Sequence, residues 1–444
     1  MSLKSSFAEF AGRSSYWVLH NLFHGGSSLP GKITLKLDPN ILQAFSKRYD
    51  LIIVTGTNGK TLTTALTVRV AKEKYPSVLT NPSGSNMEQG VVTAFITGPR
   101  PHKKGLAVLE IDEAYVVRIT RYIKPIAIVM TNLFRDQMDR YGEIYTTYDK
   151  ILAGVKLAPK ATIIANGDDQ IFNTKKLPNP VIYYGFNHEH HDDIKAPANT
   201  DGLLCPKCHH ILHYHAISYA NLGNYFCPHC GFHRPELTHQ VTALGKMTPT
   251  SSDFEIDGHK MHIGVGGLYN IYNALAAYSV GRFLGIDPTK IQQAFMGDER
   301  VFGRQEIIHV GNKDVTLILV KNPVGLNQVL DMITTDPEPF SFGFLLNANY
   351  ADGIDTSWIW DGHFEKLLDY PIAQYLTGGE RYRDISTRLR MAGVDQIHEE
   401  PDLTKVLEQI PNMPTKHIYL LSSYTAMLQM RKLMKEKGFI KSGR

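Results

Sequence analysis

The stretch "VTGTNGKTLTT" at residues 54–64 restricts the possible fold most, because it has the form of a phosphate-binding loop. The apolar run "LIIVTG" before it predicts a buried strand, and "KTLTTALTVRVAKEKY" after it has helical periodicity up to Pro76. Strand, loop and helix in this order predict a parallel α/β sheet with the loop at the carboxyl end of a strand. The common loop places its first glycine five residues before the second, whereas Gly56 lies three residues before Gly59.

This loop predicts a nucleotide site, and the alternative is a glycine-rich turn that holds no ligand. In a nucleotide site, the backbone N–H groups of Thr57, Asn58, Gly59 and Lys60 surround the phosphates at the amino end of the helix. The Lys60 side chain then meets the outer phosphates, and the Thr61 hydroxyl is placed to bind Mg²⁺.

Strand-like runs recur along the rest of the chain and predict two α/β units. In the first half they lie at 105–112, 125–132, 161–169 and 180–186, and in the second half at 315–320, 340–348, 371–378 and 417–423. A length of 444 residues fits two or three domains. We therefore expect an amino-terminal segment at 1–45, a central ATP-binding domain at 46–300 and a smaller α/β domain at 301–444.

All four cysteines lie close together, as Cys205-Pro-Lys-Cys208 and Cys227-Pro-His-Cys230. Two such pairs with this separation are typical of a structural zinc site in which four thiolates surround the metal. Two disulfides or free thiols are the alternatives, and a reducing compartment disfavours disulfides. The flanking sequence interrupts the α/β pattern, so we expect a zinc ribbon inserted at about 198–238.

Composition excludes some classes of protein. A formal charge of +4 on 444 residues does not indicate nucleic-acid binding, and the chain contains no run of eighteen apolar residues and no signal-peptide pattern near its start. We therefore expect a cytoplasmic protein with at most peripheral membrane contact. Phe7, Phe10 and Trp17 lie at loosely helical spacing, which fits an interfacial helix or, as we favour, a helix packed on its own domain.

Further polar residues follow predicted strands or lie on predicted helices. Glu110, in "LEIDEAY", follows a strand and is a candidate Mg²⁺ ligand. Asn270 and Asn273 lie almost one helical turn apart and suit contacts to an adenine edge, while Arg304 in "VFGRQE" offers a cation to a phosphate in transfer. Each of these residues, taken alone, is also compatible with a cap, a turn or a surface pair.

Together, "TGTNGKT", the strand-end Glu110, "TN...D..D", "G.YN..NALAA" and "GR.E" resemble the Mur ligase superfamily. The resemblance implies that ATP activates a carboxylate as an acyl phosphate, which an amine then attacks. It implies phosphate and Mg²⁺ roles for Lys60 and Thr61, a Mg²⁺ role for Glu110 and an adenine-side role for Asn270 and Asn273. Arg304 takes the γ-phosphate role.

The chain also departs from the superfamily pattern. Gln137 and Tyr269 stand where many members have histidines, and "LVKNP" around Lys321, which we count among the cofactor-binding candidates, replaces an acidic motif. About fifty residues precede the loop, which we expect to be too few for the domain that holds a UDP-linked substrate. Within the superfamily, the chain is similar to the ligase subunits of lipid II isoglutaminyl synthases. That resemblance implies amidation of D-isoglutamate in a lipid-linked peptidoglycan precursor, with ammonia from a GatD-type glutaminase in a heterodimer.

The number of cysteines indicates whether this chain could itself release ammonia from glutamine. Glutamine hydrolysis commonly uses a cysteine nucleophile, and no cysteine remains outside the predicted zinc ribbon. The resemblance implies that this subunit lends an aspartate to its partner, and "YADGIDTSWIWD" offers Asp352, Asp355 and Asp361, of which we choose Asp355 as catalytic. Turn and capping roles are the alternative for all three.

Two other functions stay open from the sequence. One is a Mur or folylpolyglutamate type of ligase that adds an amino acid to a carboxylate. The other is a zinc-ribbon scaffold that binds a nucleotide without catalysis, although only one lysine lies between the outer cysteines of the ribbon.

Overall fold

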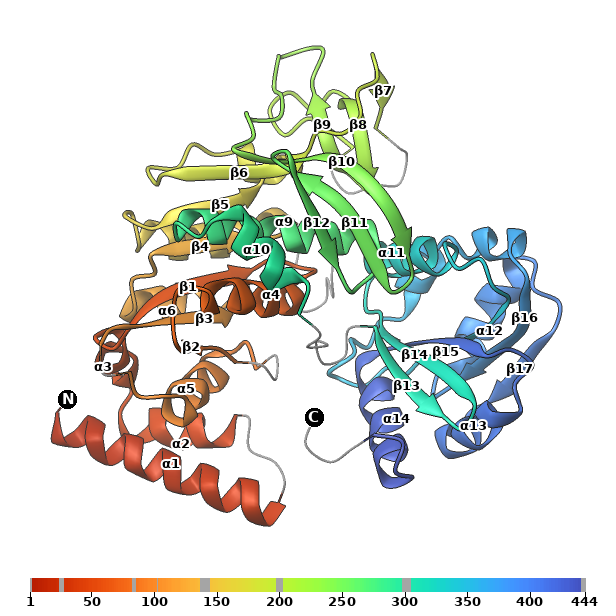
Figure 1. The fold of residues 1–444 in the computed structure, drawn as a ribbon, viewed down its shortest axis with the longest axis horizontal. Coiled ribbons are helices and arrows are strands. Elements are labelled where there is room, and N and C mark those ends of the chain that lie inside the picture. Colours follow the sequence, from red (N-terminus) through yellow and green to blue (C-terminus); the bar gives the residue numbers. More distant parts are fainter. Residues whose placement is uncertain are drawn as a thin grey trace.

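Two β-sheets, each covered by helices, form the frame of the molecule (Figure 1). The computed structural model describes residues 2–23, 28–81, 85–101, 103–135, 144–196, 203–297 and 305–440. The first sheet is built from the chain up to residue 263 and the second from the chain after residue 305. None of the described helices is both long enough and apolar enough to cross a lipid bilayer.

The first sheet has nine strands in the order β12-β11-β10-β6-β5-β4-β1-β3-β2. The strands from β1 to β6 pair in parallel, and β10 is parallel to β6. Strands β11 and β12 extend the sheet beyond β10 as antiparallel neighbours. The bounds are β1 Tyr49–Thr55, β2 Val78–Leu79, β3 Gly105–Glu110, β4 Ala127–Met130, β5 Thr162–Asn166, β6 Val181–Phe186, β10 His239–Thr248, β11 Ser251–Ile256 and β12 His259–Ile263.

Strand β1 shows how the sequence sets this architecture. Its side chains alternate between two buried clusters, with Ile52 and Val54 on one face of the sheet and Leu51 and Ile53 on the other. A strand buried on both faces reads as a continuous apolar run, as "LIIV" does. The predicted strand, loop and helix around the phosphate-binding motif are confirmed, although the helix ends at Lys72, before Pro76.

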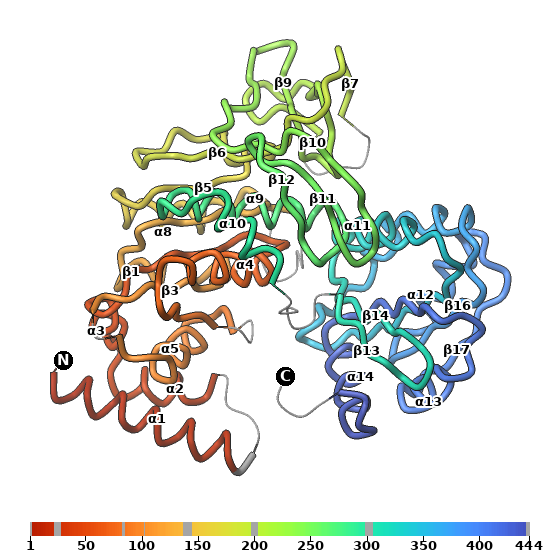
Figure 2. Tube along the Cα trace, viewed as in Figure 1, coloured from red at the N-terminus to blue at the C-terminus, as the bar shows by residue number. Residues whose placement is uncertain are grey.

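Helices cover both faces of the first sheet. One face carries α4 Lys60–Lys72, α9 Leu268–Phe283 and α10 Pro288–Phe295. The other face carries α3 Ile41–Ser46, α5 Glu88–Thr97, α6 Val116–Tyr122 and α8 Ile144–Lys156. Outside them, α1 Leu3–Phe23 packs on α2 Leu29–Leu37 and α5, which places α1 at the edge of the molecule (Figure 2). The short helix η1 Gln170–Asn173 follows β5.

A small antiparallel sheet projects beside β6 and β10 (Figure 1). It consists of β7 Ile194–Lys195, β8 His213–Tyr219 and β9 Leu222–Phe226, and it has its own apolar core that includes Cys205, Leu212, Tyr214 and Tyr225. This sheet occupies the region in which the sequence predicts an inserted ribbon, and it begins slightly earlier, at β7.

The second sheet has the order β13-β14-β18-β15-β16-β17 and is parallel except for the β13 hairpin with β14. The strands are β13 Glu306–Val310, β14 Lys313–Leu319, β15 Phe340–Leu345, β16 Ile372–Gly378, β17 Ile397–Glu400 and β18 His417–Ser422. Its helices are α11 Pro323–Ile333, η2 Ser357–Asp361, η3 Phe364–Asp369, α12 Tyr382–Met391, α13 Leu403–Gln409, η4 Ile410–Asn412 and α14 Tyr424–Glu436. The four strands predicted in this half are confirmed, and β13 and β17 are additional.

Candidate active site

At two positions of the phosphate-binding loop there is room only for glycine. Gly56 and Gly59 have φ angles of 129° and 85°, which L side chains rarely adopt. A Cβ on Gly59 would lie 2.0 Å from Oδ1 of Asn273, and one on Gly56 would lie 2.3 Å from Oγ1 of Thr131. The loop is therefore pressed against β4 on one side and α9 on the other.

Lys60 is the first residue of α4 and is buried beneath the loop. Its Nζ donates to the carbonyl oxygens of Gly56 and Thr57 and forms an ion pair with Glu113 at 3.1 Å. Burial alone would lower the pKa of Lys60, but the carboxylates of Glu113, Glu110 and Asp112 outweigh it and raise the pKa. Lys60 therefore keeps its charge although it is buried beside the loop.

Glu110 ends β3 directly beside the loop. Its Oε2 accepts a hydrogen bond of 2.9 Å from Oγ1 of Thr61, and its Oε1 accepts one of 3.2 Å from Nδ2 of Asn86. The Asn81 side chain holds the Glu110 backbone: its Nδ2 donates to the Glu110 carbonyl oxygen, and its Oδ1 accepts from the Glu110 N–H group. A carboxylate and a hydroxyl oxygen at this separation fit the oxygen ligands that Mg²⁺ prefers.

A pocket lies between the two sheets, next to the loop. Residues from both halves of the chain line it, among them Asn58, Gly59, Leu62, Tyr269, Asn270, Asn273, Lys321, Asn322 and Gln328. Asn58 and Asn322 join the two walls through reciprocal side-chain hydrogen bonds of 3.3 and 3.0 Å. The pocket therefore depends on how the second sheet sits against the first.

Asn270 and Asn273, which the sequence assigns to the adenine side, are both buried and both line this pocket. Nδ2 of Asn273 donates to Oδ1 of Asn270 at 3.2 Å, and Thr63 donates to Asn273 at 3.2 Å. Asn270 in turn donates to the Gly266 carbonyl oxygen at 2.6 Å. This chain of amides connects α9 to α4 and holds the pocket wall in one arrangement.

Several polar residues of the pocket, among them Tyr219, Gln305 and Asn322, were not expected from the sequence. Tyr219, at the end of β8, extends from the small antiparallel sheet into the pocket. Gln305, at a φ of 51°, contacts the Gly266 backbone and the Tyr269 hydroxyl. Asn322 caps α11 by accepting from Gly325 N–H, and an asparagine before a proline at a helix start was the one signal in the sequence that indicated it.

Other predicted residues have different outcomes. Arg304, Gln137 and the two aspartates of "TN...D..D", Asp136 and Asp139, lie outside the described residues. Lys321 lines the pocket. Burial raises the pKa of Glu113, while the charge of Lys60 and, to a smaller extent, that of Lys321 act to lower it. Lys321 thus belongs to the same charged group as Lys60 and Glu113.

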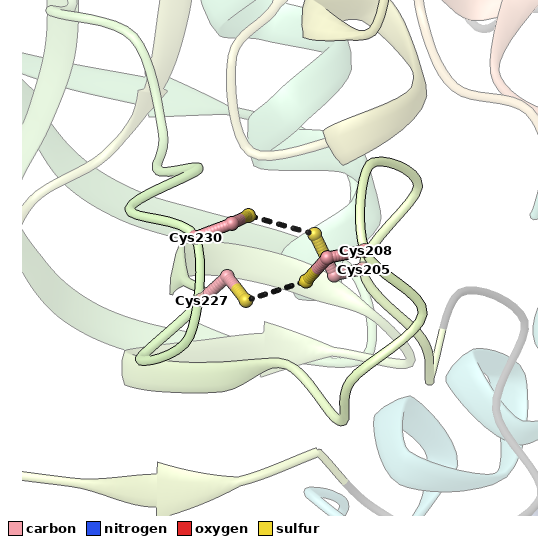
Figure 3. Close-up of side chains that lie close together, drawn as sticks. All are labelled: Cys205, Cys208, Cys227 and Cys230. Carbon is pink, nitrogen blue, oxygen red and sulfur yellow. Dashed lines mark hydrogen bonds between the residues drawn. The ribbon is translucent and has the colours of Figure 1, made fainter.

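The four cysteines converge from two turns of the small sheet (Figure 3). The Sγ atoms of Cys205 and Cys230 are 3.6 Å apart, those of Cys208 and Cys227 are 3.4 Å apart, and all four lie within 4.8 Å of one another. A disulfide requires about 2.05 Å, whereas a tetrahedral zinc–thiolate site with bonds of about 2.3 Å separates its sulfurs by roughly 3.8 Å. The geometry therefore fits a four-thiolate metal site and excludes two disulfides.

Charged groups attach the small sheet to the first sheet. The Arg234 guanidinium donates to Oδ1 of the fully buried Asp168 at 2.9 Å, and the Tyr272 hydroxyl of α9 donates to Oδ2 of Asp168 at 2.6 Å. Tyr272 also shares a hydrogen bond of 2.9 Å with Ser218, the neighbour of Tyr219. Hydrogen bonds therefore connect the sheet that carries the cysteine cluster to helix α9.

The segment after β15 carries the three candidate aspartates, and their surroundings differ. Asp352 is buried and accepts hydrogen bonds from the Thr425 N–H and hydroxyl groups, which ties the segment to the start of α14. Asp355 is exposed, and a hydrogen bond from the Ser357 N–H lowers the pKa of its carboxyl group. Asp361 is exposed at the end of η2. Asp355 and Asp361 are therefore the two that a second protein could reach.

Comparisons with known proteins agree with this geometry. Residues 54–227 match the family described as Mur ligase middle domain, and residues 319–427 match the one described as MurT ligase C-terminal. Subunit MurT of lipid II isoglutaminyl synthase (glutamine-hydrolyzing) from Streptococcus pneumoniae is 51% identical over 99% of each chain. The subunit of that name from Staphylococcus aureus is 34% identical over 86% of each chain. The fold is similar to that of a pseudomurein peptide ligase type C from Methanothermus fervidus, with a TM-score of 0.66, 18% identity and coverage of 90% of this chain and 81% of the other.

Proposed function

The chain belongs to the MurT family of Mur ligases, and from this premise we propose that it is the ligase subunit of a lipid II isoglutaminyl synthase. It amidates lipid II with the use of ATP, converting the α-carboxylate of D-isoglutamate in the stem peptide to D-isoglutamine. The observation that carries this proposal is the loop with its buried Lys60 beside Glu110 and Thr61, in a pocket that both sheets line.

The residues around the loop have different proposed roles. We assign Thr57, Asn58 and Gly59 to the phosphates through their backbone N–H groups, and Lys60 to the outer phosphates. Thr61 and Glu110 are the Mg²⁺ ligands, because their oxygens already lie together at 2.9 Å. When bound, ATP and Mg²⁺ supply the phosphoryl group that activates the carboxylate and the charge that stabilises its transfer.

The pocket residues orient the reactants. We assign Asn270 and Asn273 to the adenine side, and Lys321 and Arg304 to the phosphates in transfer. Ammonia then attacks the acyl carbon, the new C–N bond forms, and the C–O bond to the phosphate breaks. The phosphate leaves with the electron pair, and the attacking nitrogen gives up one proton to the phosphate or to solvent. Gln305 anchors the backbone next to Arg304 through its contacts with Gly266.

The four cysteines are proposed to hold one structural zinc. The closest pairs of Sγ atoms are 3.4 and 3.6 Å apart and all four lie within 4.8 Å of one another, which suits four thiolates around one metal ion. Four thiolates leave no open coordination position for a substrate. The proposed metal therefore stabilises the ribbon that carries Tyr219 into the pocket.

A separate GatD-type glutaminase is proposed as the source of ammonia. All four cysteines of the chain belong to the ribbon cluster, so none is left for glutamine hydrolysis. The segment after β15 offers a docking surface, because Tyr350, Ile354 and Trp360 are exposed around Asp355. Asp355 is ionised and exposed, as a carboxylate that orients a partner's histidine must be. Because the acceptor is linked to a lipid, we place the reaction at the cytoplasmic face of the membrane.

The aspartates supply the experiment that tests this assignment. Asp355→Asn in the two-subunit complex is expected to suppress glutamine-dependent amidation and to spare ammonium-dependent amidation by the ligase. Asp361→Asn, also exposed, serves as the matched control and should leave both reactions unchanged. Asp352→Asn should lower the stability of the fold, because it removes the tie to α14. Equal loss of both nitrogen sources, or of neither, in the Asp355 variant would refute the role.

A further inference from the structure

Helix α1 contacts the rest of the molecule with one face only. Ala8 is fully buried on that face, and a Cβ on Gly12 would lie 2.1 Å from Oγ1 of Thr34 in α2, so the two helices are in close contact. The opposite face consists of large apolar side chains with high exposed fractions: Leu3 93%, Phe7 63%, Phe10 69%, Trp17 65% and Val18 39%. We call this set the α1 outer face.

The members of the α1 outer face lie along one side of the helix. Leu3, Phe7, Phe10 and Trp17 are separated by four, three and seven residues, the spacing that puts side chains above one another on a helix, and the exposed Ser14 and Asn21 share this side. Several large exposed apolar side chains along one side of a helix mark a contact site, whereas single exposed apolar residues do not. The expectation that this helix packs on its own domain is therefore confirmed for one face, and the other face needs a separate explanation.

The charges around α1 are arranged asymmetrically. Glu9, on the packed side, is buried and bound by Arg13, Arg48 and Arg100. Asp38 is buried as well and accepts a hydrogen bond of 2.6 Å from Ser5. The acidic groups of α1 and of the end of α2 therefore point inward.

Exposed cations, in contrast, lie on both helices. Lys4 follows Leu3 on α1, and Lys32 and Lys36 are exposed one turn apart on α2, which packs against α1. Exposed apolar and aromatic side chains together with lysines are the pattern of a helix that lies in a membrane interface. Interfaces between proteins are, by comparison, depleted in lysine.

We propose that the α1 outer face binds the surface of a bilayer that contains anionic lipids. Phe7, Phe10 and Trp17 enter the boundary between headgroups and acyl chains, and Lys4, Lys32 and Lys36 face the lipid phosphates. This inference rests on the proposed function, because a lipid-linked acceptor requires the enzyme to work at a membrane surface. It adds the part of the chain that makes the contact.

The full chain reports its own binding through Trp17. Trp358→Phe and Trp360→Phe remove the other tryptophans, so that fluorescence comes from Trp17 alone. Vesicles of phosphatidylcholine with phosphatidylglycerol should shift this emission to the blue and sediment the protein, and pure phosphatidylcholine vesicles should do so much more weakly. Added salt should reduce binding to the anionic vesicles. Unchanged Trp17 emission with both kinds of vesicle would overturn the proposal.

Substitutions separate the α1 outer face from other exposed apolar groups. Phe7→Ser, Phe10→Ser and Trp17→Ser together should lower vesicle partitioning by about tenfold or more. The matched control, Met296→Ser with Met391→Ser, replaces residues that are 65% and 70% exposed outside α1 and should leave partitioning unchanged. Lys32→Glu with Lys36→Glu should weaken binding to the anionic vesicles alone. Equal loss in the control would contradict the assignment to α1.

Amidation of a water-soluble stem peptide with ammonium tests the proposed function separately. The triple variant should retain this reaction, whereas its reaction with acceptor embedded in vesicles should decline. Wild-type protein that amidates the soluble peptide but does not bind vesicles would disprove the membrane contact and leave the proposed function intact. A wild-type dimer that the triple variant converts to a monomer would show that a second copy of the chain covers the face, and this too would overturn the proposal.

Discussion

Replacing Gly59 with alanine perturbs the junction between the phosphate-binding loop and the pocket. The new Cβ would lie 2.0 Å from Oδ1 of Asn273, so the loop or the amide has to move. The φ of 85° adds a backbone penalty of about 1–2 kcal/mol for a residue other than glycine. Asn273 then loses its hydrogen bonds to Thr63 and Asn270, each with a net contribution of about 1 kcal/mol.

A second glycine separates the two effects. Gly258, in the turn between β11 and β12, has a φ of 82°, and a Cβ added there would meet no atom within 4 Å. Gly258→Ala therefore carries the backbone penalty without the clash, and it should lower the free energy of unfolding by about 1–2 kcal/mol. Gly59→Ala should lower it by roughly 3–4 kcal/mol, the sum of the strain and the two hydrogen bonds.

Calorimetric titration with ATP measures the functional consequence. The loop and Asn273 are proposed to contact ATP, and Gly59→Ala displaces both, so the equivalent of two hydrogen bonds to the nucleotide is lost, about 2 kcal/mol or roughly 30-fold in Kd. Gly258→Ala should bind ATP as the wild type does, because β12 lies at the far edge of the sheet from the loop. Wild-type affinity in Gly59→Ala, or equal weakening in both variants, would refute the contact between the loop and Asn273.

Three further changes test other parts of the molecule. Lys60→Ala and Glu110→Gln should each slow ammonium-dependent amidation by about a hundredfold or more while the fold persists, and near-normal turnover would remove that residue from the site. Chelation, or Cys208→Ser with Cys227→Ser, should release zinc near one equivalent and lower Tm, and a metal-free protein of full stability would contradict the structural metal. Burial would raise the pKa of Glu9, but hydrogen bonds from Arg48 and Arg100 lower it in the folded protein. Ionised Glu9 therefore stabilises the fold at pH values above its unfolded pKa of about 4.3. This stabilisation is lost as the pH falls through the pKa of Glu9 in the folded protein. Unfolding curves of Glu9→Gln and wild type should accordingly converge in acid and diverge at neutral pH.

The sequence predicted the strands that are buried on both faces. Runs such as "LIIV" and "AIVM" are apolar throughout, so β1 and β4 could be placed without tertiary information. The antiparallel strands β10 to β12 were not predicted, because their residues alternate between buried and exposed and carry many polar groups. That pattern identifies a strand only once the neighbouring strands are known.

The candidate site was predicted where its residues are close to a recognisable motif. Lys60, Thr61 and Glu110 lie at the ends of β1 and β3, which are adjacent in a parallel sheet, so their meeting follows from the topology. Tyr219 and Gln305 were missed, because their place in the pocket depends on how the small antiparallel sheet folds back and on how the chain enters the second sheet. The sequence favoured a helix packed on its own domain but could not show that α1 also has an exposed apolar face, because it does not show which face α2 covers.

Amidation of lipid II by the purified chain, with isotope-labelled ammonium as the nitrogen source, tests the central claim most directly. The proposed function predicts that label enters the stem peptide as one carboxamide at the α-carboxyl of the D-glutamyl residue, with equimolar release of phosphate from ATP. Product formation without ATP would contradict it. Incorporation of an added amino acid in place of ammonium would contradict it as well, and would identify the chain as an amino acid ligase.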